Sequence, residues 1–158
     1  MKLSELIIPA AIVPQLQHSD RDGAIEELIN ALIASRAVTK SLRGDLIKLI
    51  IDREKKGSTG FGKGVAVPHV KHAKIKGMVA AIGVSQQGVD FNALDKLPVF
   101  SIVLLLSSED KPDEHLQAME NIFSNLQNDT FRRFLRQSTT VEEIQDLIQE
   151  ADAQQLQG

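Results

Sequence analysis

Cysteine, tryptophan and tyrosine are all absent from this 158-residue chain. Without cysteine the protein has no disulfide framework, no thiolate metal ligand and no cysteine nucleophile. Phe is the only aromatic residue type, which argues against a platform for stacking nucleic-acid bases. A basic excess is absent as well, because 18 Lys and Arg residues stand against 21 Asp and Glu residues. The resulting net charge of -3 makes nucleic acid an unexpected partner.

Long hydrophobic runs are absent too. The longest apolar stretches, such as Ile102 to Leu106, are far shorter than the roughly 20 residues of a membrane-spanning helix. The N-terminus, Met1 to Glu5, contains an acid, and no small-residue cleavage site follows an apolar run there, which argues against a signal peptide. We therefore expect a cytoplasmic protein without membrane insertion. Its length suits one domain over residues 1–158, with a frayed tail at residues 153–158.

The spacing of apolar residues predicts helices near both ends of the chain. Five segments have the period of a helix with one buried face: Ile25 to Ile33, Leu42 to Ile50, Leu116 to Leu126, Phe131 to Leu135 and Val141 to Ile148. Asp20 or Ser19 can cap the first helix, and Thr39 begins the second. The second helix is expected to end at Lys55 and Lys56, with Gly57 just beyond it.

The middle of the chain predicts strands. Short β-branched runs, bounded by Gly and Pro, lie at Val65 to Val67 and at Met78 to Val84. Val99 to Leu106 is apolar almost without alternation, which indicates a central strand covered on both faces. The order of elements predicts an α/β protein in which a sheet lies between two helical layers. Because the strands are clustered, part of the sheet should be antiparallel, giving a mixed sheet.

The segment from Gly57 to His69 is the most informative stretch. Its start is close to the nucleotide P-loop, G-x-x-x-x-G-K-[ST], but Gly64 replaces the hydroxyl residue that would hold magnesium. The loop also follows a helix and opens a strand, which is the reverse of the P-loop order. A G-x-G-x-x-G fingerprint fails because Val65 occupies the last glycine position. Four glycines in eight residues exceed the need of a plain turn and favour a concavity of backbone N–H groups for an anion.

Two of the histidines and one arginine are candidates for a site next to this loop. Arg53 continues the apolar stripe of its helix at i+7 from Leu46, so it is expected on the inward face, where an arginine needs an anion or an ordinary salt bridge. His115 extends the stripe of the third helix toward its N-terminus, where Asp113 can cap. A satisfied core histidine is the alternative for His115. His69 directly follows Pro68, at the exit of a strand.

The other two histidines are weaker candidates. His18 lies among polar residues and is interpreted as a solvated loop residue. His72 stands three residues after His69, but the strand context and the lack of cysteine argue against a metal site. We therefore expect no metal and no cofactor.

Phosphoryl transfer through histidine fits these candidates. A neutral imidazole at His69 can attack phosphorus in line. The dianionic adduct then needs a cation, backbone N–H donors and a second imidazole as hydrogen-bond donor. Arg53, the Gly57–Gly64 loop and His115 would supply them.

The segments Arg53 to Gly62 and Val65 to His69 resemble the motif of the fructose/mannitol-type enzyme IIA domains of the bacterial phosphotransferase system, a family that includes the nitrogen-regulatory IIA proteins. Asp113 to Leu116 resembles the family's second-histidine motif. The resemblance covers nearly the whole chain. It implies a three-layer α/β/α sandwich with a mixed four- or five-stranded sheet.

The resemblance also implies roles for individual residues. His69 would be the phosphoacceptor, with Arg53 and His115 as its phosphate-facing partners. The loop residues that would bind phosphate are Ser58, Thr59, Gly60 and Gly62. Two positions are less typical of the family: Lys63, which adds a positive charge at the rim of the pocket, and Val70, which stiffens the segment after His69.

The function implied is that of a phosphohistidine carrier rather than an enzyme acting on a free substrate. Phospho-HPr, or its nitrogen-branch counterpart, would be the donor. The acceptor would be a IIB domain in sugar uptake or a regulatory target protein. The absence of a IIB cysteine domain and of a membrane IIC segment slightly favours the regulatory role. A purely regulatory interaction domain or a passive anion-binding domain is the alternative, and the oligomeric state stays open.

Overall fold

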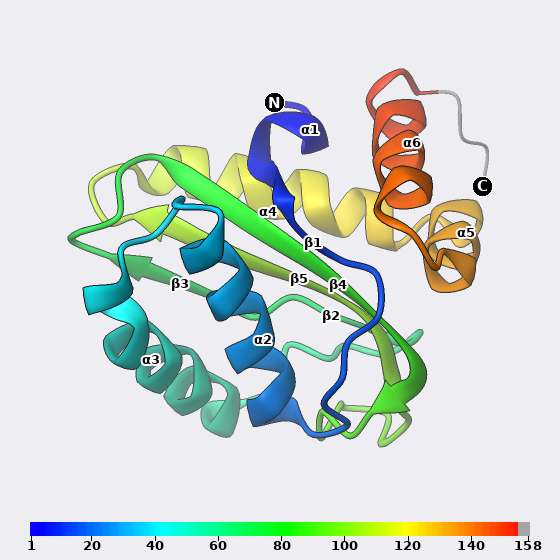
Figure 1. Ribbon diagram of the computed structural model, residues 1–158, viewed down its shortest axis with the longest axis horizontal. Coiled ribbons are helices and arrows are strands. Elements are labelled where there is room, and N and C mark those ends of the chain that lie inside the picture. Colours follow the sequence, from blue (N-terminus) through cyan, green and yellow to red (C-terminus); the bar gives the residue numbers. More distant parts are fainter. Residues whose placement is uncertain (155–158) are drawn as a thin grey trace.

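A mixed sheet lies between two layers of helices in the computed structural model, which describes residues 1–154 (Figure 1). The five strands of the described chain are β1 (Ile7–Val13), β2 (Val65–Ala66), β3 (His69–His72), β4 (Met78–Val89) and β5 (Val99–Ser108). β4 and β5 are antiparallel. β1 runs parallel to β4, and β2 and β3 both run parallel to β5. The three-layer mixed sandwich is therefore confirmed.

The helices are those that the apolar stripes predict, with one short addition at the N-terminus. They are α1 (Leu3–Leu6), α2 (Arg21–Ala34), α3 (Arg43–Lys56), α4 (Pro112–Leu126), α5 (Asp129–Gln137) and α6 (Val141–Asp152). A 3-10 turn, Lys40–Leu42, precedes α3 with Thr39 as its N-cap. The α2 and α3 helices cover one face of the sheet, and α1, α4, α5 and α6 lie on the other (Figure 1).

β5 is the central strand that its apolar sequence predicts. Its side chains alternate between two hydrophobic cores. Ile102, Leu104 and Leu106 belong to the core under α2 and α3. Val103 and Leu105 belong to the core under α4, α5 and α6. A fully buried side chain of this kind contributes about 1.5–3 kcal/mol, so β5 holds both layers on the sheet.

The N-caps agree with prediction for α2 but not for α4. Asp20 accepts a hydrogen bond from the backbone N–H of Gly23 at 3.0 Å, which satisfies an N–H at the helix start. In α4 the cap position is Lys111, without a side-chain hydrogen bond, and Pro112 is the first helical residue. The prediction that Asp113 caps α4 is wrong, because the helix begins at Pro112 and its cap position is therefore Lys111, two residues before Asp113. Asp113 remains in the first turn, where its negative charge interacts favourably with the positive end of the helix dipole.

Three apolar residues that the stripes placed on buried faces are exposed: Leu49 (39%), Leu116 (58%) and Phe134 (46%). Two strands, β1 and β3, lie where no strand was predicted. β1 contains Pro9, and its pairing with β4 is irregular between Ile7 and Ile12, so its sequence lacks a clean strand pattern. Part of the predicted frayed tail, residues 155–158, lies outside the described residues.

None of the helices in residues 1–154 is both long and apolar enough to span a membrane. Within the same residues, no group of three or more His, Cys, Asp and Glu side chains could hold a metal ion.

Candidate functional site

His69 is the first residue of β3 and is half-buried. Its Nδ1 lies 2.7 Å from the carbonyl oxygen of Val67. A carbonyl oxygen only accepts hydrogen bonds, so Nδ1 must carry the proton. In the neutral ring the lone pair is then on Nε2. The backbone of the segment before β3 thus selects Nε2 as the nucleophilic atom of this imidazole.

The backbone on either side of His69 is fixed to β5. The N–H of Leu105 donates to the carbonyl oxygen of Pro68 at 3.0 Å, and His69 itself is in register with Leu105. The side chain therefore extends from a backbone held by sheet hydrogen bonds rather than from a free loop.

His115 lies next to His69, although the two residues come from different elements. It is in the first turn of α4 and is only 9% exposed. The two ring centroids are 5.7 Å apart, with an angle of 46° between the ring planes. The structure thus brings together the two histidines that the sequence singled out.

Ser107 is the hydrogen-bond partner of His115. Its Oγ lies 2.7 Å from His115 Nδ1, and Ser107 is fully buried in β5. Burial lowers the pKa of His115 below the usual 6.5, and the positive charges of His69, when that ring is protonated, and of Lys71 lower it further. His115 is therefore neutral at pH 7. If the Ser107 hydroxyl donates to Nδ1, the N–H of His115 is on Nε2.

Arg53 is exposed, and its predicted inward position is wrong. Its Nη1 donates to the carbonyl oxygen of Gly57 at 2.8 Å, at the C-terminal end of α3. Successive residues of a helix are turned by about 100° around its axis, so Arg53, four residues after Leu49, lies on nearly the same face as Leu49. That face is exposed and forms one edge of the apolar stripe. The buried residues of α3 are Leu46, Ile47, Ile50 and Glu54.

Glu54, rather than Arg53, is the charged residue on the buried side of α3, with 3% exposure. Its Oε1 accepts from the backbone N–H of Thr59 at 3.0 Å, and its Oε2 accepts from the Thr59 hydroxyl at 2.6 Å. Sequence reasoning missed this residue. The signal was present, because Glu54 falls four residues after Ile50 and eight after Leu46 on the buried face.

The glycine-rich loop, Gly57–Gly64, divides into two parts: a first part around Thr59 and a second part from Gly62 to Gly64. The first part lies beside the segment that leads to His69, because the Val67 N–H donates to the Thr59 carbonyl oxygen at 3.4 Å. The second part lies at the start of β5, where the N–H groups of Phe100 and Ser101 both donate to the Gly64 carbonyl oxygen. Gly62, with φ +114°, belongs to this second part, through a bridge to Val65.

In the first part, several hydrogen-bond donors bind acceptors of the loop or of α3 and so stabilise the conformation of the loop. Both hydrogen-bond donors of Thr59 are used by Glu54. The N–H of Gly60 donates to Ser58 Oγ at 2.9 Å. Gly60 also has little space, since a Cβ there would lie 2.9 Å from Ala93 Cβ. These contacts shape the backbone beside His69, and phosphate binding by the loop stays a prediction.

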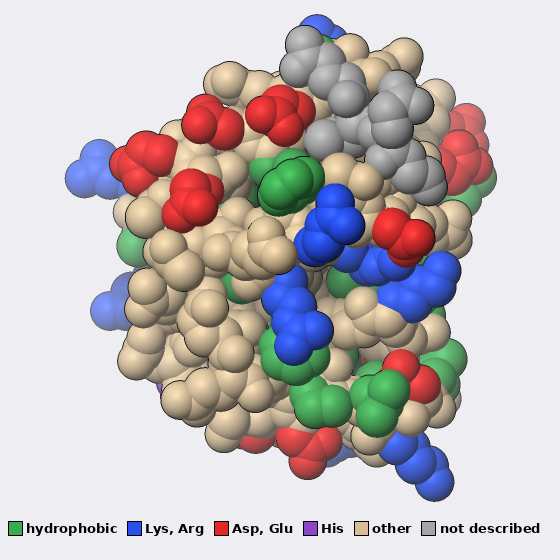
Figure 2. Space-filling view, turned by 90° about the vertical axis from the view of Figure 1, so that its right-hand side faces the viewer, with side chains coloured by type: hydrophobic (Ala, Val, Ile, Leu, Met, Phe, Trp, Pro, Cys, Tyr) green, Lys and Arg blue, Asp and Glu red, His purple; other side chains and the backbone are tan. Residues whose placement is uncertain are grey.

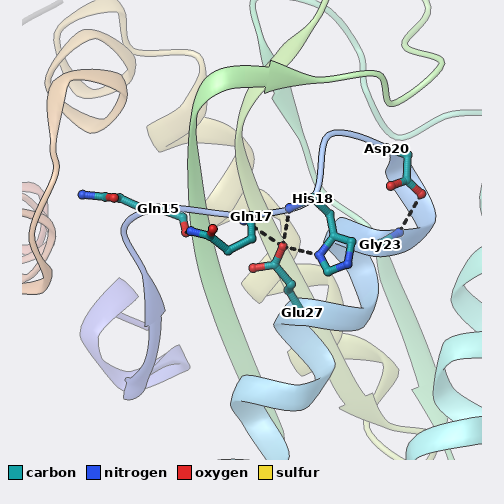
Figure 3. Close-up of polar contacts among 6 residues, drawn as sticks. All are labelled: Gln15, Gln17, His18, Asp20, Gly23 and Glu27. Carbon is teal, nitrogen blue, oxygen red and sulfur yellow. Dashed lines mark hydrogen bonds and ion pairs between the residues drawn. The ribbon is translucent and has the colours of Figure 1, made fainter.

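The remaining histidines have partners of their own. His72 accepts a hydrogen bond from the Lys74 N–H at Nδ1, so its Nε2 donates to Asp45 at 2.8 Å. His18 is exposed, as predicted, and its Nδ1 lies 2.6 Å from Glu27 Oε1 (Figure 3). The same oxygen accepts from the backbone N–H of His18 at 2.6 Å. In the described part of the chain, neither His18 nor His72 forms a pair with a second histidine ring, as His69 does with His115.

Residues 5–151 match the family model described as "Phosphoenolpyruvate-dependent sugar phosphotransferase system, EIIA 2". The chain is 30% identical to a nitrogen regulatory protein of Bradyrhizobium diazoefficiens, over 94% of this chain and 95% of that protein. It is 28% identical to the fructose-specific EIIABC component of Bacillus subtilis, over 96% of this chain and only 24% of that protein. The crystal structure of the nitrogen regulatory protein IIA-Ntr from Neisseria meningitidis has a TM-score of 0.82 and 28% identity, covering 92% of this chain and 98% of that one.

Proposed function

Because the chain belongs to the EIIA 2 family of the phosphoenolpyruvate-dependent sugar phosphotransferase system, we propose that it is a phosphohistidine carrier with His69 as the phosphoacceptor. The observation that carries the proposal is the hydrogen bond from His69 Nδ1 to the Val67 carbonyl oxygen. It leaves Nε2 unprotonated in the neutral ring, which is the form that a nucleophile needs.

The transfer step is a displacement at phosphorus. The Nε2 lone pair of His69 forms the new N–P bond, while the P–N bond to the donor's phosphohistidine breaks and its electron pair returns to the donor imidazole. Nδ1 keeps its proton throughout. The phosphorylated ring then has substituents on both nitrogens and carries positive charge, which the Val67 carbonyl oxygen stabilises through the same hydrogen bond.

His115 is proposed as a neutral hydrogen-bond donor to the phosphoryl group. Its ring lies beside that of His69, and its low pKa keeps it from carrying a charge at pH 7. A neutral donor stabilises the adduct without holding it as strongly as a cation would. Onward transfer would thereby remain fast.

Arg53 is proposed as the cation for the adduct, although it is exposed in the unphosphorylated protein. One of its five N–H donors holds the Gly57 carbonyl oxygen, and the fork of a guanidinium has further donors for phosphate oxygens. Its place at the end of α3 is next to Ser58, Thr59 and Gly60, which together with Gly62 are the loop residues proposed for phosphate binding. The donors of Thr59 and Gly60 would have to exchange their hydrogen bonds to Glu54 and Ser58 for the phosphate.

The proposed donor is phospho-HPr or its nitrogen-branch counterpart. The proposed acceptor is a IIB component in sugar uptake or a regulatory target protein. The likeness to IIA-Ntr in structure and sequence supports the second role, in which the charge added at His69 changes the affinity for a target. The likeness to the fructose-specific component supports the first role.

Labelling tests the proposal directly. The protein is incubated with phosphoenolpyruvate, enzyme I and HPr, or the nitrogen-branch enzymes, and an acid-labile mass increase is measured. We expect wild type and His72→Ala to gain the phosphoryl group and His69→Ala to gain none. His72→Ala is a matched control because His72 lies on the same strand. If neither donor system labels the wild type, the protein is a passive anion-binding or interaction domain instead.

A further inference from the structure

A basic pocket of about 670 Å³ lies beside α5, between the loop before β2 and the start of β5. Figure 2 faces this side of the molecule and shows Lys and Arg side chains gathered near its middle. Among the described residues that line the pocket are four cationic side chains and one acidic side chain: Lys63, Arg132, Arg133, Arg136 and Asp129. This concentration of positive charge contrasts with the net charge of -3 of the whole chain.

The pocket is separate from the two-histidine site. Val65 lines it and is in register with Ser101, whereas His69 is in register with Leu105. Ser101 and Leu105 are four residues apart along β5, which corresponds to about 13 Å of extended strand. The function proposed for His69 does not use this pocket, and the pocket does not depend on that function.

Two of the arginines are held in place by the fold. The guanidinium carbon of Arg136 lies 3.5 Å from the centre of the Phe100 ring, so the flat face of the guanidinium is covered and its N–H edge remains for a ligand. Arg132 donates from Nη1 to the Leu126 carbonyl oxygen at 2.8 Å and also pairs with Asp129. Such anchoring reduces the side-chain entropy that binding would cost.

Lys63 reaches the pocket through an unusual backbone conformation. It has φ +60° and stands between two glycines that also have positive φ, Gly62 and Gly64. A lysine in this region is uncommon and costs conformational energy. The Gly64 carbonyl oxygen, which accepts from the N–H groups of Phe100 and Ser101, holds the loop in place against β5. The second part of the glycine-rich loop thus presents a cation to the pocket.

We propose that this pocket binds a small organic phosphate. Guanidinium forks match pairs of phosphate oxygens and form charge-assisted hydrogen bonds with them. The volume lies in the range of about 300–1,000 Å³ that is typical of small-molecule sites. A hollow of this size favours a compact anion over an acidic protein segment, because protein interfaces of standard size bury about 800 Å² on each partner.

Calorimetry with inorganic pyrophosphate as the probe tests the proposal, at about 0.15 M salt where weak surface attraction is screened. We expect saturable binding, at least tenfold weaker in Arg136→Gln and in Lys63→Gln. Lys63 is exposed, so its variant should fold normally, as a circular dichroism melt would verify. Arg36→Gln removes an exposed arginine from the turn after α2 and should bind as wild type does.

Further binding measurements show where the anion binds and which kind of anion the pocket prefers. His69→Ala should bind pyrophosphate as tightly as wild type, and loss of binding there would place the anion at the histidine site and overturn the proposal. Citrate should bind at least tenfold more weakly than pyrophosphate. Equal binding of citrate, or binding of a poly-glutamate peptide without binding of pyrophosphate, would also overturn it.

Discussion

Glu54 and Thr59 form a buried pair in which both carboxylate oxygens of Glu54 accept hydrogen bonds from Thr59. The pair connects the last turn of α3 to the loop beside His69. Since the Thr59 carbonyl oxygen in turn accepts from the Val67 N–H, the contacts run from α3 to the residue whose carbonyl oxygen orients the His69 ring.

Glu54→Ala should lower the free energy of unfolding by about 2–3 kcal/mol, because it leaves two donors of Thr59 without their charged partner. Urea unfolding would measure the change. Asp52→Asn is the matched control on the same helix. Asp52 pairs with Lys48 at the surface, where water screens the pair, so the loss of stability should be much smaller. Equal losses in the two variants would contradict the importance of the buried pair.

Ser107→Ala should change the tautomer of His115. The Ser107 hydroxyl is the partner of His115 Nδ1, and without it the Nδ1–H form competes with the Nε2–H form. Nitrogen-15 chemical shifts of the His115 ring in the unphosphorylated protein would show the change. We also expect about tenfold slower phosphoryl transfer. Ser107→Thr, which keeps the hydroxyl, should retain the wild-type tautomer. An unchanged tautomer in Ser107→Ala would refute this assignment.

Arg53→Ala should shorten the lifetime of the phosphorylated protein by about tenfold, the effect of losing one charge-assisted hydrogen bond, while leaving the fold intact. Arg53 is exposed, so its removal creates no cavity. Acid-labile phosphate is followed over time after removal of the donor. Lys55→Ala, which removes an exposed cation from the same helix turn, serves as the control. A normal lifetime in Arg53→Ala would exclude its pairing with the adduct.

His115→Ala should slow transfer from His69 to the acceptor more than it slows loading of His69. The donor role proposed for His115 acts on the phosphoryl group already attached to His69, whose ring is 5.7 Å away. Rapid-quench measurements of the two half-reactions would separate the steps. Equal slowing of both would count against this role.

His18 and His115 should affect stability in opposite directions as pH changes. The hydrogen bond to Glu27 raises the pKa of His18 above 6.5, so its stabilisation is complete below pH 6.5 and is lost as pH rises through the folded-state pKa. Burial lowers the pKa of His115, so its contribution is present above pH 6.5 and is lost as pH falls through its folded-state pKa.

Urea unfolding between pH 5 and 8 would show these two slopes. His18→Gln should remove the loss of stability on the alkaline side, and His115→Gln the loss on the acidic side. Proton NMR titration of the two rings gives the pKa directions independently. A His18 pKa at or below 6.5 would show that Glu27 does not hold its charged form in solution.

The elements of the fold were largely predictable because their signals are local. The Asp20 cap and the apolar stripe of α2 are both visible in the sequence, as is the nearly continuous apolar run of β5. β1 was not predicted because Pro9 interrupts it and its pairing with β4 is irregular. Short strands such as β3 depend on a partner distant in the sequence, in this case β5.

In the candidate site, the two neighbouring histidines could be predicted from the sequence, but the positions of the charged residues around them could not. His69 and His115 could be identified because each stands at the end of a recognisable apolar pattern. Arg53 and Glu54 are adjacent, and an apolar stripe does not define the buried arc of a helix to within one residue. The division of the glycine-rich loop could not be foreseen either, because it depends on which carbonyl oxygens face β5.

The attachment of Pro68 and His69 to β5 has a consequence for the order of encounters. An imidazole on a sheet-bound backbone cannot swing from one docking surface to another. Any molecule that delivers a phosphoryl group and any molecule that removes it must therefore approach from the same side and occupy overlapping footprints. With His69 as the proposed phosphoacceptor, the two encounters exclude each other, and the kinetics should follow a ping-pong scheme without a ternary complex.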